Sequence, residues 1–335
     1  MMTRNKTVLV ALAVSCFWAA SMSATRGGAL EDRPLRLLQV VETTPAEERS
    51  EDAVLVRPVS LAFNGHLLLV ADAQDCAVKI FSKDGSFVRS IGRKGAGPGE
   101  FSFPSGVCWL DGRICVADKF NYRIQILDAS GKPEGGFRVG FAPDKVHAVG
   151  AGMILVTSNP TGRPVPEKML HLFDKEGTLL WEGLETRVSG DPVYDSFKNM
   201  ILVCPDGTAG FYVIFRSGER SLLHFDASGE LLGRIAVDDR YGFKTVRLPF
   251  KGPQKSLLGF CWSAAFDRGR FYLLEPEPVE ERDLGPGRRV HVFGREGRRE
   301  AVIDLPRPVH RLVIDDGRIY ALDEEGELAV FEVVT

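Results

Sequence analysis

The stretch PSGVCWLDGRICVADKFNYRIQILDASGK, residues Pro104 to Lys132, decides the fold. Its apolar runs of four to six residues are divided by turns rich in aspartate and glycine, such as Asp111–Gly112 and Asp128–Gly131. Runs of this length are too short for typical helices and are typical of antiparallel strands joined by tight turns. We therefore predict three consecutive strands here, of which the first begins at Pro104.

The same order of strands and turns recurs along the chain. The turn after the third strand of each copy ends at a glycine: Gly85, Gly131, Gly177, Gly229 and Gly297. The first two intervals, 85 to 131 and 131 to 177, are both 46 residues, and the later ones are longer. A repeat of this length with four strands per unit is typical of a propeller blade. Counting the copies predicts an all-β fold, a single six-bladed β-propeller with four antiparallel strands per blade.

The last copy reaches only its third strand before Thr335. The segment LRLLQVVE, Leu35 to Glu42, has the pattern of a strand, and we expect it to supply the missing outer strand and close the ring. Closure leaves no free sheet edge between the first and last blades. We assign residues 1–24 to a signal peptide, 25–52 to an N-terminal segment that includes this strand, and 53–335 to the propeller.

The second copy resembles an NHL repeat. The residues that carry the resemblance are Pro104, Gly106, Val107, Gly112, Ile114, Val116, Ala117, Asp118, Asn121, Arg123, Ile124, Gln125 and Asp128. The run GAGPGEF, Gly95 to Phe101, resembles the linker that precedes such repeats in six-bladed propellers of bacterial secreted proteins. The resemblance is fair over the first copy and weak over the third to fifth copies. It implies a six-bladed propeller of this family.

The glycine-rich linker does not match a phosphate-binding loop. A P-loop requires a lysine where this chain has Pro98, and a dinucleotide loop requires a third glycine where it has Glu100. The segment also reads as strand and turn, whereas both phosphate loops open a helix. We therefore interpret the glycines as connections between blades, where their conformational freedom is needed.

The N-terminus predicts export. Arg4 and Lys6 precede a short apolar run, Val8–Ala20, and small residues follow up to Ala24. This order is typical of a cleaved secretory signal and is too short for a stable transmembrane anchor. Cys16 leaves a lipoprotein as the less favoured alternative. We predict a secreted or periplasmic protein without a transmembrane span.

Net charge and cysteine spacing exclude some classes of partner and cofactor. The formal net charge is −3, whereas a nucleic-acid-binding protein would normally carry a basic surplus, so we predict no nucleic-acid partner. The five cysteines beyond the signal are odd in number and widely spaced, which does not indicate a disulfide framework. Cys108 and Cys115 could face each other across a turn, and we favour two buried thiols over a bridge. No cysteine has metal-site spacing, and we predict no metal and no cofactor.

The long insertions indicate one functional face. In this topology, every long loop lies at the end of the ring where second strands lead to third strands and one blade leads to the next. The loop from Asp238 to Lys255 is rich in basic and aromatic residues, and we select Arg240, Tyr241, Lys244 and Arg247 as ligand-binding residues. Such a surface suits acidic or sugar-like groups or a protein partner. The alternative is a solvated connector whose aromatic residues pack on the ring.

The central channel is the second candidate. Lys145, His147 and His310 fall on predicted first strands, which line the channel of a propeller, and Arg311 is adjacent. These side chains could bind an anion or, with a third ligand, a metal. His171, His224 and His291 recur at matching places on third strands, and we favour packing roles for them. The recurring carboxylates Asp72, Asp118, Glu275 and Asp323 are expected to accept backbone N–H groups in their own turns.

These observations predict a binding module, and we expect it to be a monomer. Its partner would be a protein, peptide or carbohydrate held on the loop-rich face of blades three to five. The alternative is a metal-dependent lyase or a lactonase-like hydrolase with its site over the central channel, because propellers similar to NHL domains include such enzymes. Fold alone does not choose between these functions, and no linear catalytic motif is present.

Overall fold

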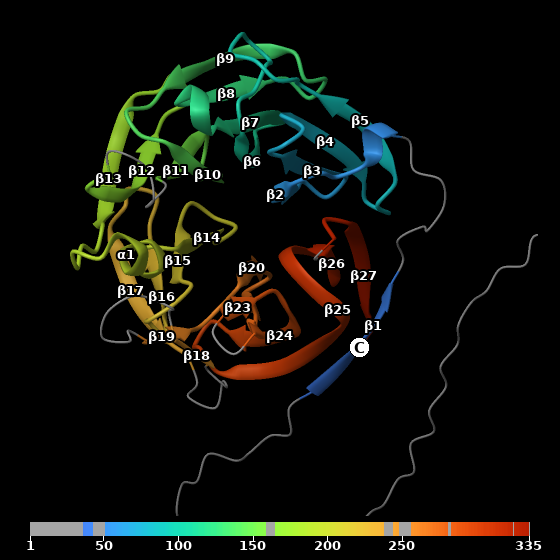
Figure 1. Ribbon diagram of the computed structural model, residues 1–335, viewed down its shortest axis with the longest axis vertical. Helices are drawn as coiled ribbons and strands as arrows, with labels where there is room; N and C mark the ends of the chain where they lie inside the picture. The colour runs from blue at the N-terminus through green and yellow to red at the C-terminus, as the bar shows by residue number, and fades with distance from the viewer. Residues whose placement is uncertain are drawn as a thin grey trace, which may run out of the picture. The chain divides into compact units, whose positions relative to one another are not determined.

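A computed structural model describes residues 36–42, 51–158, 165–237, 244–247, 256–280, 283–323 and 325–334. Within residues 35–335, antiparallel sheets follow one another around a ring in sequence order (Figure 1). The prediction of an all-β propeller is confirmed.

The first four blades are separate four-stranded sheets in which each strand pairs with the next along the chain. Blade one comprises β2 (Pro58–Phe63), β3 (Leu67–Asp72), β4 (Ala77–Ser82) and β5 (Phe87–Ile91). Blade two comprises β6 (Pro104–Leu110), β7 (Arg113–Asp118), β8 (Arg123–Leu127) and β9 (Pro133–Arg138). Blade three comprises β10 (Pro143–Val149), β11 (Met153–Ser158), β12 (Lys168–Phe173) and β13 (Leu179–Glu185). Blade four comprises β14 (Ile201–Pro205), β15 (Phe211–Phe215), β16 (Ser221–Phe225) and β17 (Leu231–Ala236).

The last two blades share one seven-stranded sheet because a single long strand serves both. β25 (Arg299–Asp315) begins as the outer strand of blade five, beside β24 (Gly287–Gly294), and ends as the inner strand of blade six, beside β26 (Arg318–Asp323). Blade five also contains β20 (Ser263–Asp267) and β21 (Arg270–Leu274), and blade six contains β27 (Leu328–Val334).

The N-terminal strand closes the ring as predicted. β1 (Arg36–Glu42) pairs antiparallel with β27 over residues 39–42 and becomes the outer strand of blade six. Its first three residues pair in parallel with residues 301–303 of β25, on blade five. β1 therefore joins the last two blades and covers an edge that would otherwise be free.

The additional elements lie on the face where blades connect. They are η1 (Glu51–Ala53), η2 (Lys119–Asn121), α1 (Pro192–Lys198), the hairpin of β18 (Lys244–Arg247) with β19 (Ser256–Gly259), and the hairpin of β22 (Glu277–Glu280) with β23 (Asp283–Gly285). None of the helices in the described ranges is sufficiently long and apolar to cross a membrane.

Apolar packing between blades forms the core. Six clusters of buried side chains, counted over the described residues, fill the spaces between neighbouring blades. The cluster between blades six and one contains Tyr320 and Leu328 from one side and Leu68 and Phe81 from the other. The ring is thus closed by hydrophobic burial as well as by β1.

Glycine is required where consecutive blades approach closely. A Cβ on Gly106 would lie 2.8 Å from Cα of Lys145, so glycine lets β10 pass beside β6. Gly229 has φ +85°, and a Cβ there would lie 2.2 Å from the ring of Trp181 in the preceding blade. The periodic turn glycines therefore combine a left-handed backbone with contact between blades, which explains why the repeat is visible in the sequence.

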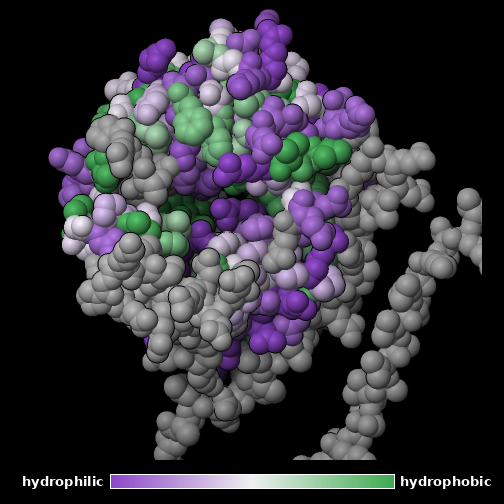
Figure 2. Space-filling model, viewed as in Figure 1, coloured by the Kyte–Doolittle hydropathy of each residue, from purple (hydrophilic) through white to green (hydrophobic). Residues whose placement is uncertain are grey.

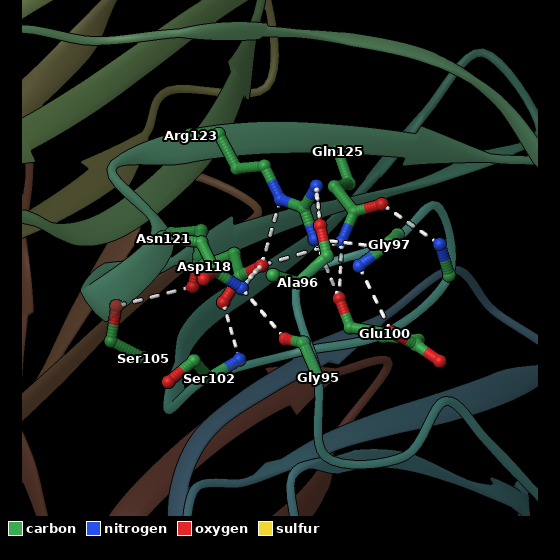
Figure 3. A network of polar contacts seen from close by, with 12 residues as sticks. Gly95, Ala96, Gly97, Glu100, Ser102, Ser105, Asp118, Asn121, Arg123 and Gln125 are labelled. Atoms are coloured by element: carbon green, nitrogen blue, oxygen red, sulfur yellow. Dashed lines mark hydrogen bonds and ion pairs between the residues drawn. The ribbon is translucent and has the colours of Figure 1, made fainter.

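Side chains of blade two hold the glycine-rich linker in place (Figure 3). Buried Asp118 accepts hydrogen bonds from the Ser102 amide at 2.7 Å, Asn121 Nδ2 at 2.8 Å and Arg123 Nε at 2.9 Å. Arg123 also donates to three linker carbonyls, those of Ala96, Gly97 and Glu100, each at 2.8 Å. The linker is therefore a structural connection whose carbonyl groups are bound by its own blade.

Candidate functional site

A cavity of about 950 Å³ occupies the centre of the ring. Its wall is built from the inner strands of all six blades, β2, β6, β10, β14, β20 and β25, and from residues next to them. Figure 2 shows a hollow at the centre of one face, bordered mainly by hydrophilic residues with hydrophobic ones between them. This volume is in the range of small-molecule sites.

Lys145 lies on β10 and lines the cavity. Its Nζ donates to the carbonyl oxygen of Ser105 at 2.6 Å and to that of Val59 at 3.2 Å, so the ammonium group reaches the inner strands of two other blades. No carboxylate pairs with it among the described residues. Desolvation by the surrounding protein, together with nearby cations, lowers the pKa of Lys145 to about 8.

Two arginines line the same cavity. Arg216 follows β15, and its guanidinium lies 4.1 Å from the ring centroid of Trp262. Its Nε is buried without a hydrogen-bond partner among the described residues, and desolvation with repulsion from Arg311 lowers its pKa to about 9. Arg311, on β25, donates to the carbonyl of His310 at 3.1 Å, and desolvation lowers its pKa.

Lys119 adds a fourth cation, and Asp144 supplies a carboxylate beside it. Their charged atoms are 3.9 Å apart, and the Asp144 side chain is 36% exposed. We call Lys119, Lys145, Arg216 and Arg311 the channel cations. Within the described part of the chain, Arg216, Lys145 and Arg311 have no ion pair, although Asp206, Asp267 and Asp315 also line the cavity. Unpaired charge away from bulk water is costly, and an anion would offset that cost.

The two histidines predicted to line the channel differ in their position relative to the cavity. His147 lines the cavity, and desolvation together with Lys145 lowers its pKa to about 4, so it is neutral at pH 7. His310 lies on the inner half of β25 but is not among the residues that line the cavity. Its ring lies 6.4 Å from that of Trp262. The binding role of His310 stays a prediction, and Arg311, its neighbour on the strand, contributes to the cavity wall.

The third-strand histidines are structural, but they do not all match. His171 pairs with Val156, two residues before Ser158 at the end of β11, and His291 pairs with Leu273, two residues before Glu275, which directly follows β21. His224 instead pairs with Tyr212, three residues before the end of β15. The expected matching position is therefore wrong for His224, which stacks on Tyr212 and contacts Asp206 at 3.0 Å.

The recurring carboxylates match the expectation only in part. Asp323 accepts the amide N–H groups of Glu325 and Glu327 in its own turn. Asp72 accepts that of Asp75 in its own turn, but also those of Val56 and Arg57, at 2.6 and 2.9 Å, in the connector before β2. Glu275 differs, because it contacts His291 Nε2 at 2.9 Å. Over the residues that the structure describes, no three His, Cys, Asp or Glu side chains gather into a group that could hold a metal ion.

The cysteines beyond the signal region are free and buried. Cys108 and Cys115 lie directly opposite each other on β6 and β7, as predicted, and both are thiols. Their mutual hydrogen bond and burial raise the pKa of Cys115. A thiol of raised pKa is a weak nucleophile, which fits packing roles.

The predicted basic loop is described only in part. Arg240 and Tyr241 lie outside the described residues. Lys244 and Arg247 are the ends of β18, for which the structure describes the backbone. Their role in binding stays a prediction.

Sequence reasoning selected Lys145 and noted Arg311 but missed Lys119 and Arg216. The signal that could have found them is the position of each cation relative to the end of the second strand in its blade. Lys119 and Arg216 each directly follow the second strand of their blade, and their amides donate to Phe103 and Met200, the residues before the inner strands. Lys145 and Arg311 likewise each pair with the residue before the end of the second strand. An alignment of the blades on these positions could have found all four.

Comparison with known proteins supports the fold. A family model described as a 6-bladed β-propeller matches residues 48–129. No curated protein matches the sequence. The family model does not identify an NHL repeat, so that resemblance stays a prediction.

Solved propellers of different roles resemble the chain. A "putative exported protein" from Bacteroides fragilis is 11% identical with TM-score 0.58, covering 89% of this chain and 95% of that one. A gluconolactonase from Xanthomonas campestris is 15% identical with TM-score 0.57, covering 89% and 90%. A streptogramin B lyase is 9% identical with TM-score 0.51, covering 89% and 98%. At these identities, the similarities show the fold and leave binding and catalysis open.

Proposed function

We propose that the protein is an exported binding propeller that holds a small anionic ligand in its central cavity. The observation that carries the proposal is the set of channel cations, which line one cavity and of which, among the described residues, only Lys119 forms an ion pair, with Asp144. Structural cations elsewhere in the chain, such as Arg123, have carboxylate partners.

The form of the cavity supports a ligand that carries a carboxylate, sulfate or phosphate group. Lys145 and Arg311 lie at equivalent positions of blades three and six, which are opposite members of a six-bladed ring. Arg216 lines the cavity with a planar guanidinium group, whose paired N–H donors suit two-point binding of an oxyanion. The proposal keeps the predicted binding role and moves its centre from the basic loop to the channel.

Isothermal titration calorimetry with citrate and with sulfate at pH 7 tests the proposal. We expect both anions to bind the wild-type protein and the double variant Lys145→Met, Arg311→Met to bind at least about 100-fold more weakly, because each lost charge-assisted hydrogen bond contributes about 1.5–3 kcal/mol.

Lys175→Met is the matched control. Lys175 lies in the turn between β12 and β13, and its side chain is 61% exposed, so this variant loses one positive charge outside the cavity. Wild-type affinity is expected for the control. Absence of binding by either anion, or equal binding by the double variant, would overturn the proposal.

The export part of the proposal rests on the predicted signal at residues 1–24, which lie outside the described residues, and on the similarity to the Bacteroides protein. Expression of the full chain in a bacterial host, followed by N-terminal sequencing of periplasmic protein, is the test. We expect a mature end close to Thr25. Retention of Met1 on cytoplasmic protein would contradict export.

A further inference from the structure

We infer that the anionic ligand carries a flat aromatic ring, bound at the mouth of the cavity against Phe103 and Phe120. This inference rests on the proposed function, because it assigns the part of the ligand that adjoins the anion. We call Arg57, Phe103, Lys119 and Phe120 the mouth cluster. Phe103 and Lys119 line the cavity, and the Arg57 guanidinium and the Phe120 ring both contact the Phe103 ring.

The backbone at Phe103 is strained. Its φ is +68°, a left-handed value that is rare for a bulky residue and costs about 1–3 kcal/mol. The surrounding hydrogen bonds maintain it: Ser102 N donates to buried Asp118 at 2.7 Å, and the carbonyl of Phe103 accepts from Lys119 N at 3.2 Å. The consequence is that an aromatic ring borders the cavity at the position that precedes Pro104, the first residue of an inner strand.

The same position in blade one provides a cation. Arg57 precedes Pro58, and its amide donates to Asp72 at 2.9 Å, as the Ser102 amide does to Asp118. The Arg57 guanidinium lies 5.2 Å from the Phe103 ring centroid, and the Lys119 ammonium lies 5.5 Å from it. Two carboxylates of the scaffold thus place an aromatic ring and two cations together at the mouth.

Phe120 leaves apolar surface open beside this arrangement. Its ring is 5.0 Å from that of Phe103, and the residue is 58% exposed. A planar ring could contact Phe120 while its acid group meets Lys119 and the deeper channel cations. Aromatic pairs contribute about 0.5–1.5 kcal/mol beyond burial, so the ring should be recognised separately from the charge.

Benzoate and cyclohexanecarboxylate are suitable probes because they carry the same charge on rings of similar size, of which only the benzoate ring is flat. We expect calorimetry to show about fivefold tighter binding of benzoate to the wild-type protein. Phe120→Ala should remove this preference and leave the affinity for cyclohexanecarboxylate within about twofold. Leu232→Ala is the control, because Leu232 is 57% exposed on the outer strand β17.

The outcomes separate the two proposals. Loss of the benzoate preference in Phe120→Ala, with the preference retained in Leu232→Ala, supports the mouth cluster as a ring-binding subsite. Equal binding of the two acids by the wild-type protein, with citrate or sulfate still bound, overturns the ring inference and leaves the proposed function intact. Failure of every anion to bind overturns both.

Discussion

Two lysines, one in blade one and one in blade three, have opposite environments. Lys79, on β4 of blade one, is 1% exposed, and its Nζ lies 2.7 Å from Asp75 and 3.9 Å from Asp72. It also donates to the carbonyl of Val54. Lys145, on β10 of blade three, contacts only backbone carbonyls, and its charged neighbours are mostly cations.

Pairing with a carboxylate distinguishes a lysine that stabilises this fold from one that is available to bind a ligand. The protein neutralises Lys79 with the carboxylates of Asp72 and Asp75. Asp72 also accepts hydrogen bonds from the amides of Val56 and Arg57 and so holds the connector before β2 in place. Lys145 instead has a depressed pKa, which means that the folded protein disfavours its charge. A residue that costs stability and borders a cavity is more readily explained by a ligand than by folding.

Substitution of Lys79 should change the free energy of unfolding most. Lys79→Met should lower the free energy of unfolding by about 3–5 kcal/mol, because it leaves buried Asp72 without its lysine partner. Urea denaturation followed by circular dichroism measures the change. A loss below about 1 kcal/mol, the range of exposed ion pairs, would remove the distinction between the two lysines.

Lys145→Met should change the free energy of unfolding by a smaller amount and with the opposite sign. At pH 7, we expect a gain of about 1–3 kcal/mol in the free energy of unfolding without ligand, since an apolar side chain replaces a desolvated and repelled charge. The same denaturation experiment, carried out in parallel with Lys79→Met, checks it. A loss comparable to that of Lys79→Met would show that Lys145 supports the fold through its bonds to Val59 and Ser105.

The sequence predicted the fold well because each blade repeats local signals. Turn glycines such as Gly229 and the segment that became β1 could be recognised without knowledge of distant contacts. The site was only partly predictable. Lys145 was found because inner strands line the channel of any propeller, whereas Arg216 reaches the cavity from a turn that only ring closure brings beside β10 and β25. The shift of His224 by one residue depends on the register of blade four, which composition does not reveal.

The pH dependence of the free energy of unfolding tests the lowered pKa of Lys145. The pKa of Lys145 is about 8 in the folded protein and 10.5 when unperturbed, so the unfolded chain binds more protons between these values. The free energy of unfolding should therefore rise with pH through this window, by about 1 kcal/mol from pH 7 to pH 9. The rise should be smaller in Lys145→Met, which retains the lowered pKa values of Arg216, about 9, and of Arg311 but lacks the contribution of Lys145. Identical pH profiles of the two proteins would contradict the lowered pKa of Lys145.

The smallest effect is expected at an ion pair that resembles neither lysine. Arg268 and Asp316 lie in exposed turns, with 2.6 Å between their charged atoms and side chains that are 66% and 70% exposed. Arg268→Ala should change the free energy of unfolding by about 0.5 kcal/mol or less, because water solvates both groups when the pair is absent. Denaturation at low and high salt measures it. A change above about 2 kcal/mol would mean that charge loss alone destabilises this propeller, and the effect at Lys79 could then no longer be attributed to burial.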